Sequence, residues 1–174
     1  MGAGILPISF YKNRIYLLFG KENKYADTPG WSDFGGGIDN GETAYQTVIR
    51  EAQEELTGFL GGDKEIKKII GKKPYTISHN GYQMFVCPIA YDESLPFYYN
   101  NNQRFLQKSL DPHIIEKSKI FEKDEIRWVP FDHIKKMRPE FRSYFKEIVD
   151  IILSKKLDLL KIVKKNKMTR KIRN

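Results

Sequence analysis

Residues 35–58, GGGIDNGETAYQTVIREAQEELTG, constrain the fold most, because they predict a glycine loop that runs into an amphipathic helix. Thr43, followed three residues later by Gln46, has the form of a capping box, which marks a helix start. Apolar residues then recur at helical spacing and form one stripe: Tyr45, Val48, Ile49, Ala52 and Leu56. Thr57 and Gly58 end the pattern, and we expect Gly58 to cap the helix. The stretch therefore predicts a helix that packs on a core along one face.

The same helix carries three glutamates close together. At about 100° per residue, Glu51, Glu54 and Glu55 fall within an arc of about 100° away from the apolar stripe. One interpretation is a solvated acidic face with a single Arg50–Glu54 ion pair, which would add little stability. The other is a site for a hard divalent cation such as Mg²⁺, which takes oxygen ligands and often substrate phosphates. Glycines 35–37 favour the cation site, since a backbone without side chains can approach a ligand closely.

A bound divalent cation polarises phosphoryl oxygens and activates water, so such a site suits hydrolysis of a phosphoanhydride. The stretch also resembles the Nudix box, which reads Gly, five residues, Glu, seven residues, then Arg-Glu-U-x-Glu-Glu-x-Gly-U, where U is bulky and aliphatic. The matching positions here are Gly36, Glu42, Arg50, Glu51, Glu54 and Glu55. Two positions depart from the pattern: Ala52 is small where U is expected, and one extra residue precedes Gly58.

The resemblance to the Nudix hydrolase superfamily implies a fold, a reaction and a set of ligands. The implied fold is of the α/β class, an α/β/α sandwich around a mixed β-sheet, and the implied reaction is attack by water on the pyrophosphate of a nucleoside diphosphate derivative. Mg²⁺ or Mn²⁺ would be held by Glu51, Glu54, Glu55 and a backbone oxygen of Gly35. Arg50 would orient a neighbouring glutamate, and Glu42 would brace the junction between loop and helix.

Many members of the superfamily use one more acid outside the box, just before a late strand that carries a tryptophan. The segment FEKDEIRWV offers Glu122, Asp124 and Glu125 ahead of Trp128. We expect Glu122 to be the metal ligand or general base, with Glu125 as the second choice. The alternative is that all three acids are solvated loop charges.

Substrate contacts in such proteins come from variable loops, here expected at residues 21–34 and 92–118. The candidate residues are Trp31, Tyr99 and Arg104, with the backbone of Gly36 and Gly37, and with Phe97 and Tyr98 as further aromatic side chains. The alternative for the aromatic residues is that they simply pack.

The remaining sequence predicts a layered α/β domain. Residues 4–11 and 14–20 read as an antiparallel strand pair, and Asn80-Gly81 between two apolar runs predicts a hairpin. EIRWVPF reads as a further strand ended by Pro130, and apolar spacing after Pro139 predicts a closing helix. The segment from residue 92 reads as a loop that leads to a short helix near 103–110.

The basic residues are concentrated at one end of the chain. The net charge is +8, and residues 155–174 alone hold nine Lys or Arg and one Asp. We therefore divide the chain into a Nudix-like domain at 1–154 and a basic tail or helix extension at 155–174. The tail is either a solvated extension of the last helix or a segment that binds a polyanion such as RNA, or anionic lipid.

The single cysteine, Cys87, excludes an intrachain disulfide and a cysteine-based zinc cluster. No apolar run is long enough to span a bilayer and no secretory signal is evident, so we expect a cytoplasmic or nuclear protein without a transmembrane segment.

Its expected function is divalent-metal-dependent hydrolysis of a small nucleotide derivative or of capped RNA. The alternative is a non-catalytic module that binds a nucleotide or RNA.

Overall fold

The computed structural model describes residues 1–24, 26–118 and 122–171, and within them a mixed sheet of seven strands. The strands are β1 (Gly2–Tyr11), β2 (Arg14–Glu22), β3 (Trp31–Ser32), β4 (Phe34–Gly37), β5 (Tyr75–His79), β6 (Tyr82–Pro88) and β7 (Lys123–Pro130). Their order is β3-β2-β1-β6-β5, and β4 also pairs with β1 while β7 also pairs with β2. β1 and β6 run parallel, and the other pairs are antiparallel.

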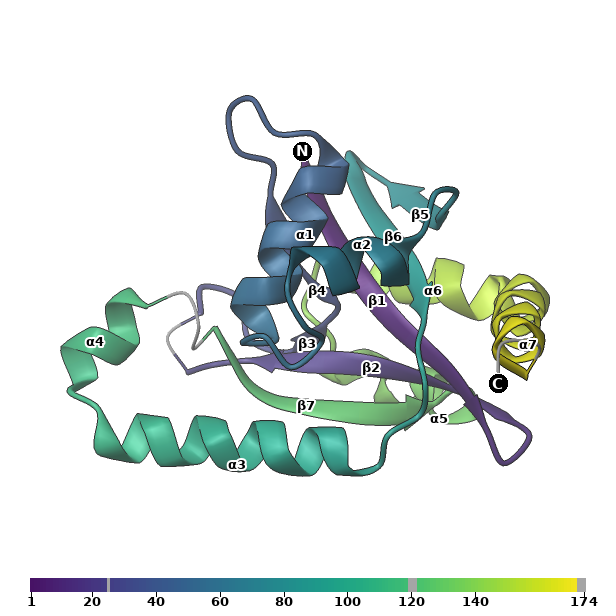
Figure 1. Cartoon of the computed structure of the whole chain (residues 1–174). Coiled ribbons are helices and arrows are strands. Elements are labelled where there is room, and N and C mark those ends of the chain that lie inside the picture. Colours follow the sequence, from purple (N-terminus) through teal and green to yellow (C-terminus); the bar gives the residue numbers. More distant parts are fainter. Residues whose placement is uncertain (25, 119–121, 172–174) are drawn as a thin grey trace.

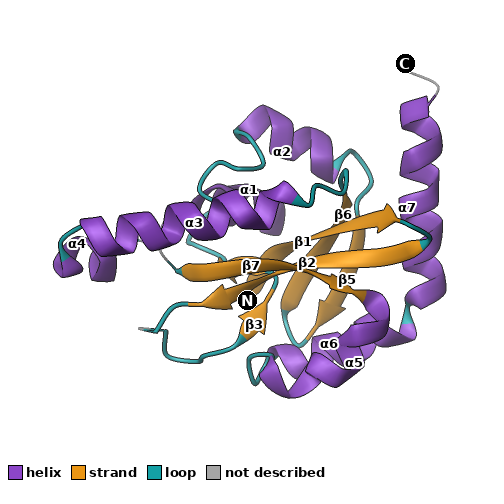
Figure 2. Cartoon of the chain, turned by 90° about the horizontal axis from the view of Figure 1, so that it is seen from below, coloured by secondary structure: helices purple, strands orange, loops and turns teal. Residues whose placement is uncertain are grey.

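Helices cover both faces of this sheet, which confirms the expected α/β/α sandwich (Figure 1). The helices are α1 (Ala44–Glu55), α2 (Asp63–Ile70), α3 (Ser94–Ser109), α4 (Pro112–Lys117), α5 (Phe131–Met137), the 3₁₀ turn η2 (Arg138–Glu140), α6 (Phe145–Ser154) and α7 (Lys156–Lys171). Figure 2 shows α1, α2 and α3 on one face, with α5 and α6 on the other.

Alternating residues of β1 supply two separate cores. Leu6 and Ile8 pack with α5, α6 and α7, whereas Ala3 and Ile5 pack with α1, α2 and α3. This follows from the strand geometry, in which successive side chains point to opposite faces. The predicted antiparallel pair of β1 and β2 is confirmed. The Asn80-Gly81 hairpin is confirmed as well, and both turn residues have the positive φ that such a turn requires.

The segment after residue 92 is helical much earlier than the sequence suggested. α3 begins at Ser94 rather than near residue 103, and Asp92 Oδ1 accepts a hydrogen bond of 2.8 Å from the Ser94 backbone N–H. Pro96 lies in the first turn, where no intrahelical N–H donor is needed. The buried residues Leu95, Tyr99 and Gln103 are spaced by four and form the face that packs inward.

The basic segment forms a helix of its own, α7, which begins after a break at Lys155. Leu159 and Val163 of this helix are buried in the same core as α6. The first part of residues 155–174 is therefore built into the fold and is not merely a solvated extension of the preceding helix. Of the described helices, none combines the length and apolarity that a membrane crossing requires.

Candidate active site

Helix α1 is fixed at its start by the predicted capping box. Thr43 Oγ1 accepts a hydrogen bond of 3.3 Å from the Gln46 N–H, and Gln46 Oε1 accepts one of 2.9 Å from the Thr43 N–H. At the other end the cap is Leu56, and the left-handed position that follows is held by Thr57, with φ of 47°. The Gly58 N–H donates back to the Gln53 carbonyl at 3.3 Å, which closes a Schellman-type turn. The prediction that Gly58 itself caps the helix is therefore wrong by two residues.

Three glutamates converge beneath this helix. Ligand oxygens of Glu51, Glu55 and Glu122 all lie within 4.8 Å of one another. Glu51 and Glu55 come from α1 and are buried, and Glu122 directly precedes β7. Glu54 is not part of this group; it lies at the half-exposed edge of α1, where its Oε2 accepts a hydrogen bond of 3.3 Å from Arg50 Nη1. We call Glu51, Glu55 and Glu122 the glutamate centre.

Two glycines of β4 leave room for side chains that pack closely against the strand. A Cβ on Gly36 would lie 2.4 Å from Glu51 Oε1, and one on Gly35 would lie 2.3 Å from the Tyr82 hydroxyl. A side chain at either position would therefore displace the neighbouring side chain or the strand. Gly37 is exposed, with open space around it, and its carbonyl accepts a hydrogen bond of 3.1 Å from Arg50 Nη2.

Arg50 connects the loop before α1 to the glutamates on it. Its guanidinium donates to Glu42 at 3.0 and 3.1 Å and to Glu51 at 2.7 Å. Glu42 also accepts from the Thr47 hydroxyl at 2.8 Å, and the Arg50 and Thr47 hydrogen bonds lower the pKa of Glu42 to about 2. Arg50 thus contacts a neighbouring glutamate of α1, and Glu42 connects the loop to the helix through Arg50 and Thr47.

A second cation, Lys123, lies on the inner side of the centre and is fully buried. Its ammonium is 3.0 Å from Glu55 Oε1, contacts Glu22 Oε1, and donates to Ser32 Oγ at 3.1 Å. Burial alone would lower the pKa of Lys123, but Glu55 and Glu22 raise it above its usual value, so the lysine keeps its proton. Arg142 Nη1 binds the same Glu22 oxygen at 2.6 Å.

The donor set of the centre fits a hard divalent cation. Burial raises the pKa of Glu51, and it raises the pKa of Glu55 well above the usual value. The Glu55 Oε2 atom is buried and has no hydrogen-bond partner among the described residues. Crowded carboxylate oxygens with an unsatisfied member are ligands that suit Mg²⁺ or Mn²⁺.

Of the acids before Trp128, the structure places only Glu122 in the centre. Asp124 accepts a hydrogen bond of 2.6 Å from the Gln107 side chain, and Glu125 forms an ion pair of 2.7 Å with Arg127. The first choice from sequence, Glu122, therefore lies in the glutamate centre, and Glu125 does not.

Two of the predicted substrate contacts are wrong because their side chains are buried. Tyr99 is fully buried on α3, and its hydroxyl donates to the Glu55 carbonyl at 2.6 Å, so it supports α1 instead of stacking on a ligand. Trp31 is also buried, with the Arg127 guanidinium over its ring. Arg104 is exposed on α3 and donates to Asn100 and Asn101 of its own helix. Phe97 and Tyr98 are exposed on the same helix.

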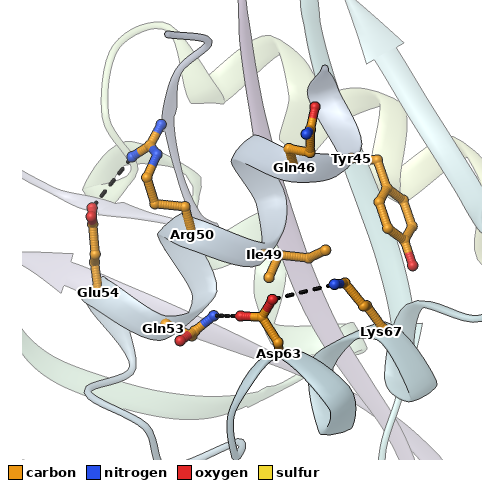
Figure 3. Close-up of a pocket in the computed structure, with 8 residues that line it drawn as sticks. All are labelled: Tyr45, Gln46, Ile49, Arg50, Gln53, Glu54, Asp63 and Lys67. Carbon is orange, nitrogen blue, oxygen red and sulfur yellow. Dashed lines mark hydrogen bonds and ion pairs between the residues drawn. The ribbon is translucent and has the colours of Figure 1, made fainter. Parts of the chain in front are cut away.

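A groove of about 410 Å³ lies between α1 and α2 (Figure 3). Arg50 and Glu54 line one side, and Asp63 bridges the helices by accepting from Gln53 at 2.5 Å and pairing with Lys67 at 3.2 Å. None of the three glutamates of the centre lines this groove. The groove and the centre therefore lie on different sides of α1.

Comparison with known proteins places the chain in a family. A model of the NUDIX domain matches residues 2–148. A search of the curated proteins found no match. Among solved structures, a C. elegans Ap4A hydrolase in a binary complex is similar with a TM-score of 0.53 at 14% identity, covering 88% of this chain and 96% of that one. The M. smegmatis Nudix hydrolase RenU gives a TM-score of 0.56 at 14% identity, covering 90% and 86%. At these identities the likeness shows the fold.

Proposed function

This chain belongs to the NUDIX domain family and is a hydrolase of phosphorus-containing acid anhydrides, and we propose that it uses Mg²⁺ or Mn²⁺ to hydrolyse a small nucleoside diphosphate derivative. The observation that carries the proposal is the glutamate centre, whose ligand oxygens lie within 4.8 Å of one another. The buried Glu55 Oε2, which has no hydrogen-bond partner among the described residues, supports it further.

The proposed roles follow from where each side chain lies. Glu51, Glu55 and Glu122 would hold the cation, with the Gly35 carbonyl as a further ligand on β4. When bound, the cation supplies Lewis-acid polarisation of the phosphoryl oxygens and activates water. Arg50 holds Glu51 in place through its contact of 2.7 Å.

A carboxylate must also accept a proton from the attacking water. Glu122 is our first candidate for this base and Glu54 the second, because Glu122 lies in the centre and Glu54 at its solvent edge. The water oxygen forms a bond to phosphorus, the bridging P–O bond breaks, and the leaving phosphate oxygen takes the bonding electron pair.

A small substrate is favoured over a long RNA by the position of the basic helix. In both views α7 lies at the far end of the sheet from the start of β7, where Glu122 precedes the strand (Figures 1 and 2). A strand held on α7 would have to pass around the molecule to reach the centre. We therefore propose that any binding of RNA through residues 155–174 does not deliver the substrate to the glutamate centre.

The test is product-release kinetics with Mg²⁺ and Mn²⁺ across ADP-ribose, dinucleoside polyphosphates, diphosphoinositol phosphates, a cap analogue and capped RNA. The dinucleoside polyphosphates are included because one structural neighbour is an Ap4A hydrolase. We expect turnover of one class of small substrate. Glu122→Gln should lower kcat by about 10²–10³-fold, since it removes a metal ligand and the proposed base.

Glu125→Gln is the matched control, because Glu125 lies three residues after Glu122, in β7, but pairs with Arg127 outside the centre. Its kcat should stay within about twofold of the wild type, since exposed ion pairs contribute little. Equal losses in the two variants would contradict the role of Glu122. If the folded wild type binds these compounds but hydrolyses none of them with either metal, the chain is a binding module instead.

A further inference from the structure

We propose that Lys123 is a positioning residue whose buried charge occupies the inner side of the glutamate centre, so that divalent cations bind only on the outer side. Removing this charge should open an additional cation position between Glu22 and Glu55. The inference rests on the proposed metal site and goes beyond it, because it concerns how many ions the site takes and where.

The ammonium of Lys123 is fully coordinated by protein oxygens. It contacts Glu22 and Glu55 and donates to the Ser32 hydroxyl, which provides one acceptor for each of its three N–H donors. The neighbouring strand leaves room for the stem, since a Cβ on Gly20 would lie only 3.0 Å from Lys123 Cδ. The fold is thus built around this cation, in a place that solvent does not reach.

The two sides of the centre differ in charge. On the inner side, the carboxylates of Glu22 and Glu55 face the cations Lys123 and Arg142. On the outer side, Arg50 contacts the carboxylates Glu42, Glu51 and Glu54, and Glu122 adds a fourth. The formal charges of these four inner side chains therefore balance, while the named outer side chains keep an excess of negative charge that attracts a divalent cation.

Lys123 also decides which oxygen of Glu55 is offered to a ligand. It holds Oε1 at 3.0 Å, and the other oxygen, Oε2, is the buried atom without a hydrogen-bond partner among the described residues. Because Lys123 directly follows Glu122, a short piece of backbone brings both the ammonium and the Glu122 carboxylate close to Glu55. An ion near Oε1 would meet the ammonium directly and be repelled strongly, whereas an ion on the Oε2 side lies farther from the ammonium and is repelled less.

The experiment counts Mn²⁺ ions bound to the full chain by electron paramagnetic resonance, with affinities from calorimetric titration. Lys123→Met keeps an unbranched side chain but removes the charge, and Lys123→Arg keeps the charge. We expect Lys123→Met to bind one Mn²⁺ more per chain than the wild type, or to bind Mn²⁺ at least tenfold more tightly. Lys123→Arg should keep the wild-type number of ions.

A second variant pair locates the added ion. Glu22→Gln combined with Lys123→Met removes one of the two carboxylates that would hold it, so the additional binding should disappear. If Lys123→Met does not fold without metal, its thermal melting is measured with and without Mn²⁺. A larger rise in Tm on adding Mn²⁺ than the wild type shows would then support the inference, and no larger rise would overturn it.

The outcomes separate this inference from the proposed function. A wild type that binds Mn²⁺, together with a folded Lys123→Met that gains neither ions nor affinity, would overturn the role of Lys123 alone. If the double variant Glu22→Gln/Lys123→Met still binds the added ion, that ion does not lie between Glu22 and Glu55. A folded wild type that binds no Mn²⁺ would overturn the metal site, and Lys123 would then have no ion to position.

Discussion

Two charge clusters flank the glutamate centre and differ mainly in their access to solvent. The outer cluster is Arg50 with Glu42, Glu51 and Glu54, and the inner cluster is Lys123 with Glu22, Glu55 and Arg142. The side chains of Arg50 and Glu42 are each 22% exposed, whereas that of Lys123 is 0% exposed. Similar ion pairs therefore have different consequences: the outer cluster can exchange its partners for water, and the inner cluster cannot.

The energetic difference follows from solvation. Exposed ion pairs gain little, because water already solvates both partners and salt screens their attraction. A buried pair is costly to break, because the remaining charge stays in a poorly solvating interior. The inner cluster should therefore determine whether the centre holds its shape, while the outer cluster adjusts to ions and substrate.

The largest expected effect on stability comes from Glu22→Gln. The substitution leaves Lys123 and Arg142 with one carboxylate fewer in a buried site. We expect the free energy of unfolding, measured by urea denaturation, to fall by about 3–5 kcal/mol. Glu42→Gln is the matched substitution in the outer cluster and should shift the midpoint much less.

Salt sharpens this comparison. At high NaCl concentration, the small effect of Glu42→Gln should shrink further, because its ion pairs with Arg50 are accessible to screening. The effect of Glu22→Gln should stay the same, since solvent does not reach Lys123. Equal losses of stability in the two variants, or an equal dependence on salt, would contradict the division into an inner and an outer cluster.

A smaller effect is expected from the same contrast of buried and exposed residues in α7. Leu159 is buried in the core, whereas Leu157, two residues earlier, is 72% exposed. Leu159→Ala should lower the free energy of unfolding by about 2–4 kcal/mol, through lost burial and the cavity left behind. Leu157→Ala should change it by less than about 0.5 kcal/mol.

Chemical denaturation of the full chain measures both leucine variants. A loss at Leu159 would mean that the basic segment is part of the folded domain beyond the expected boundary at residue 154. If neither substitution changes the free energy of unfolding, α7 contributes nothing to stability and is an appended tail.

The outer cluster could be predicted from sequence, whereas Glu55 was the one member of the inner cluster that the sequence identified. Glu42, Arg50, Glu51 and Glu54 lie within one loop and one helix, so their spacing alone brings them together. Glu22, Lys123 and Arg142 come from distant parts of the chain and meet only when β2, β7 and the segment before α6 assemble. Lys123 stands in the charged run FEKDEIRWV, where a buried lysine has no local signature.

The same difference between local and long-range sequence signals explains why the predicted start of α3 and the predicted role of Tyr99 were wrong. The sheet, the hairpin and helix α1 have strong local patterns, and the structure confirms them. In α3 the apolar positions are interrupted by Pro96 and by a run of asparagines, which resemble a loop. Tyr99 then looks like an exposed loop aromatic, although its hydroxyl bonds to the Glu55 carbonyl inside the protein. A spacing of four from Leu95 to Tyr99 to Gln103 was the signal that could have identified the buried face.

The smallest expected effect on stability comes from backbone strain, not from charge. It concerns the C-terminal end of α1, the helix that contributes to both clusters. Thr57 adopts φ of 47° in the left-handed region, at the position where the Nudix pattern has glycine. A side chain with a Cβ pays about 1–2 kcal/mol there, while glycine loses about 0.5–1 kcal/mol through its greater freedom in the unfolded chain. In addition, Thr57 Oγ1 is buried without a hydrogen-bond partner among the described residues.

We therefore expect Thr57→Gly to raise the free energy of unfolding by about 1 kcal/mol in urea denaturation. Thr57→Ala separates the two causes, because it removes the hydroxyl but keeps the Cβ and its strain. If only Thr57→Gly raises the free energy of unfolding, backbone strain destabilises the wild type. If Thr57→Ala raises it equally, the buried hydroxyl is the cause. If Thr57→Gly is less stable than the wild type, the left-handed turn is not strained, and the extra residue before Gly58 has been accommodated without cost to α1.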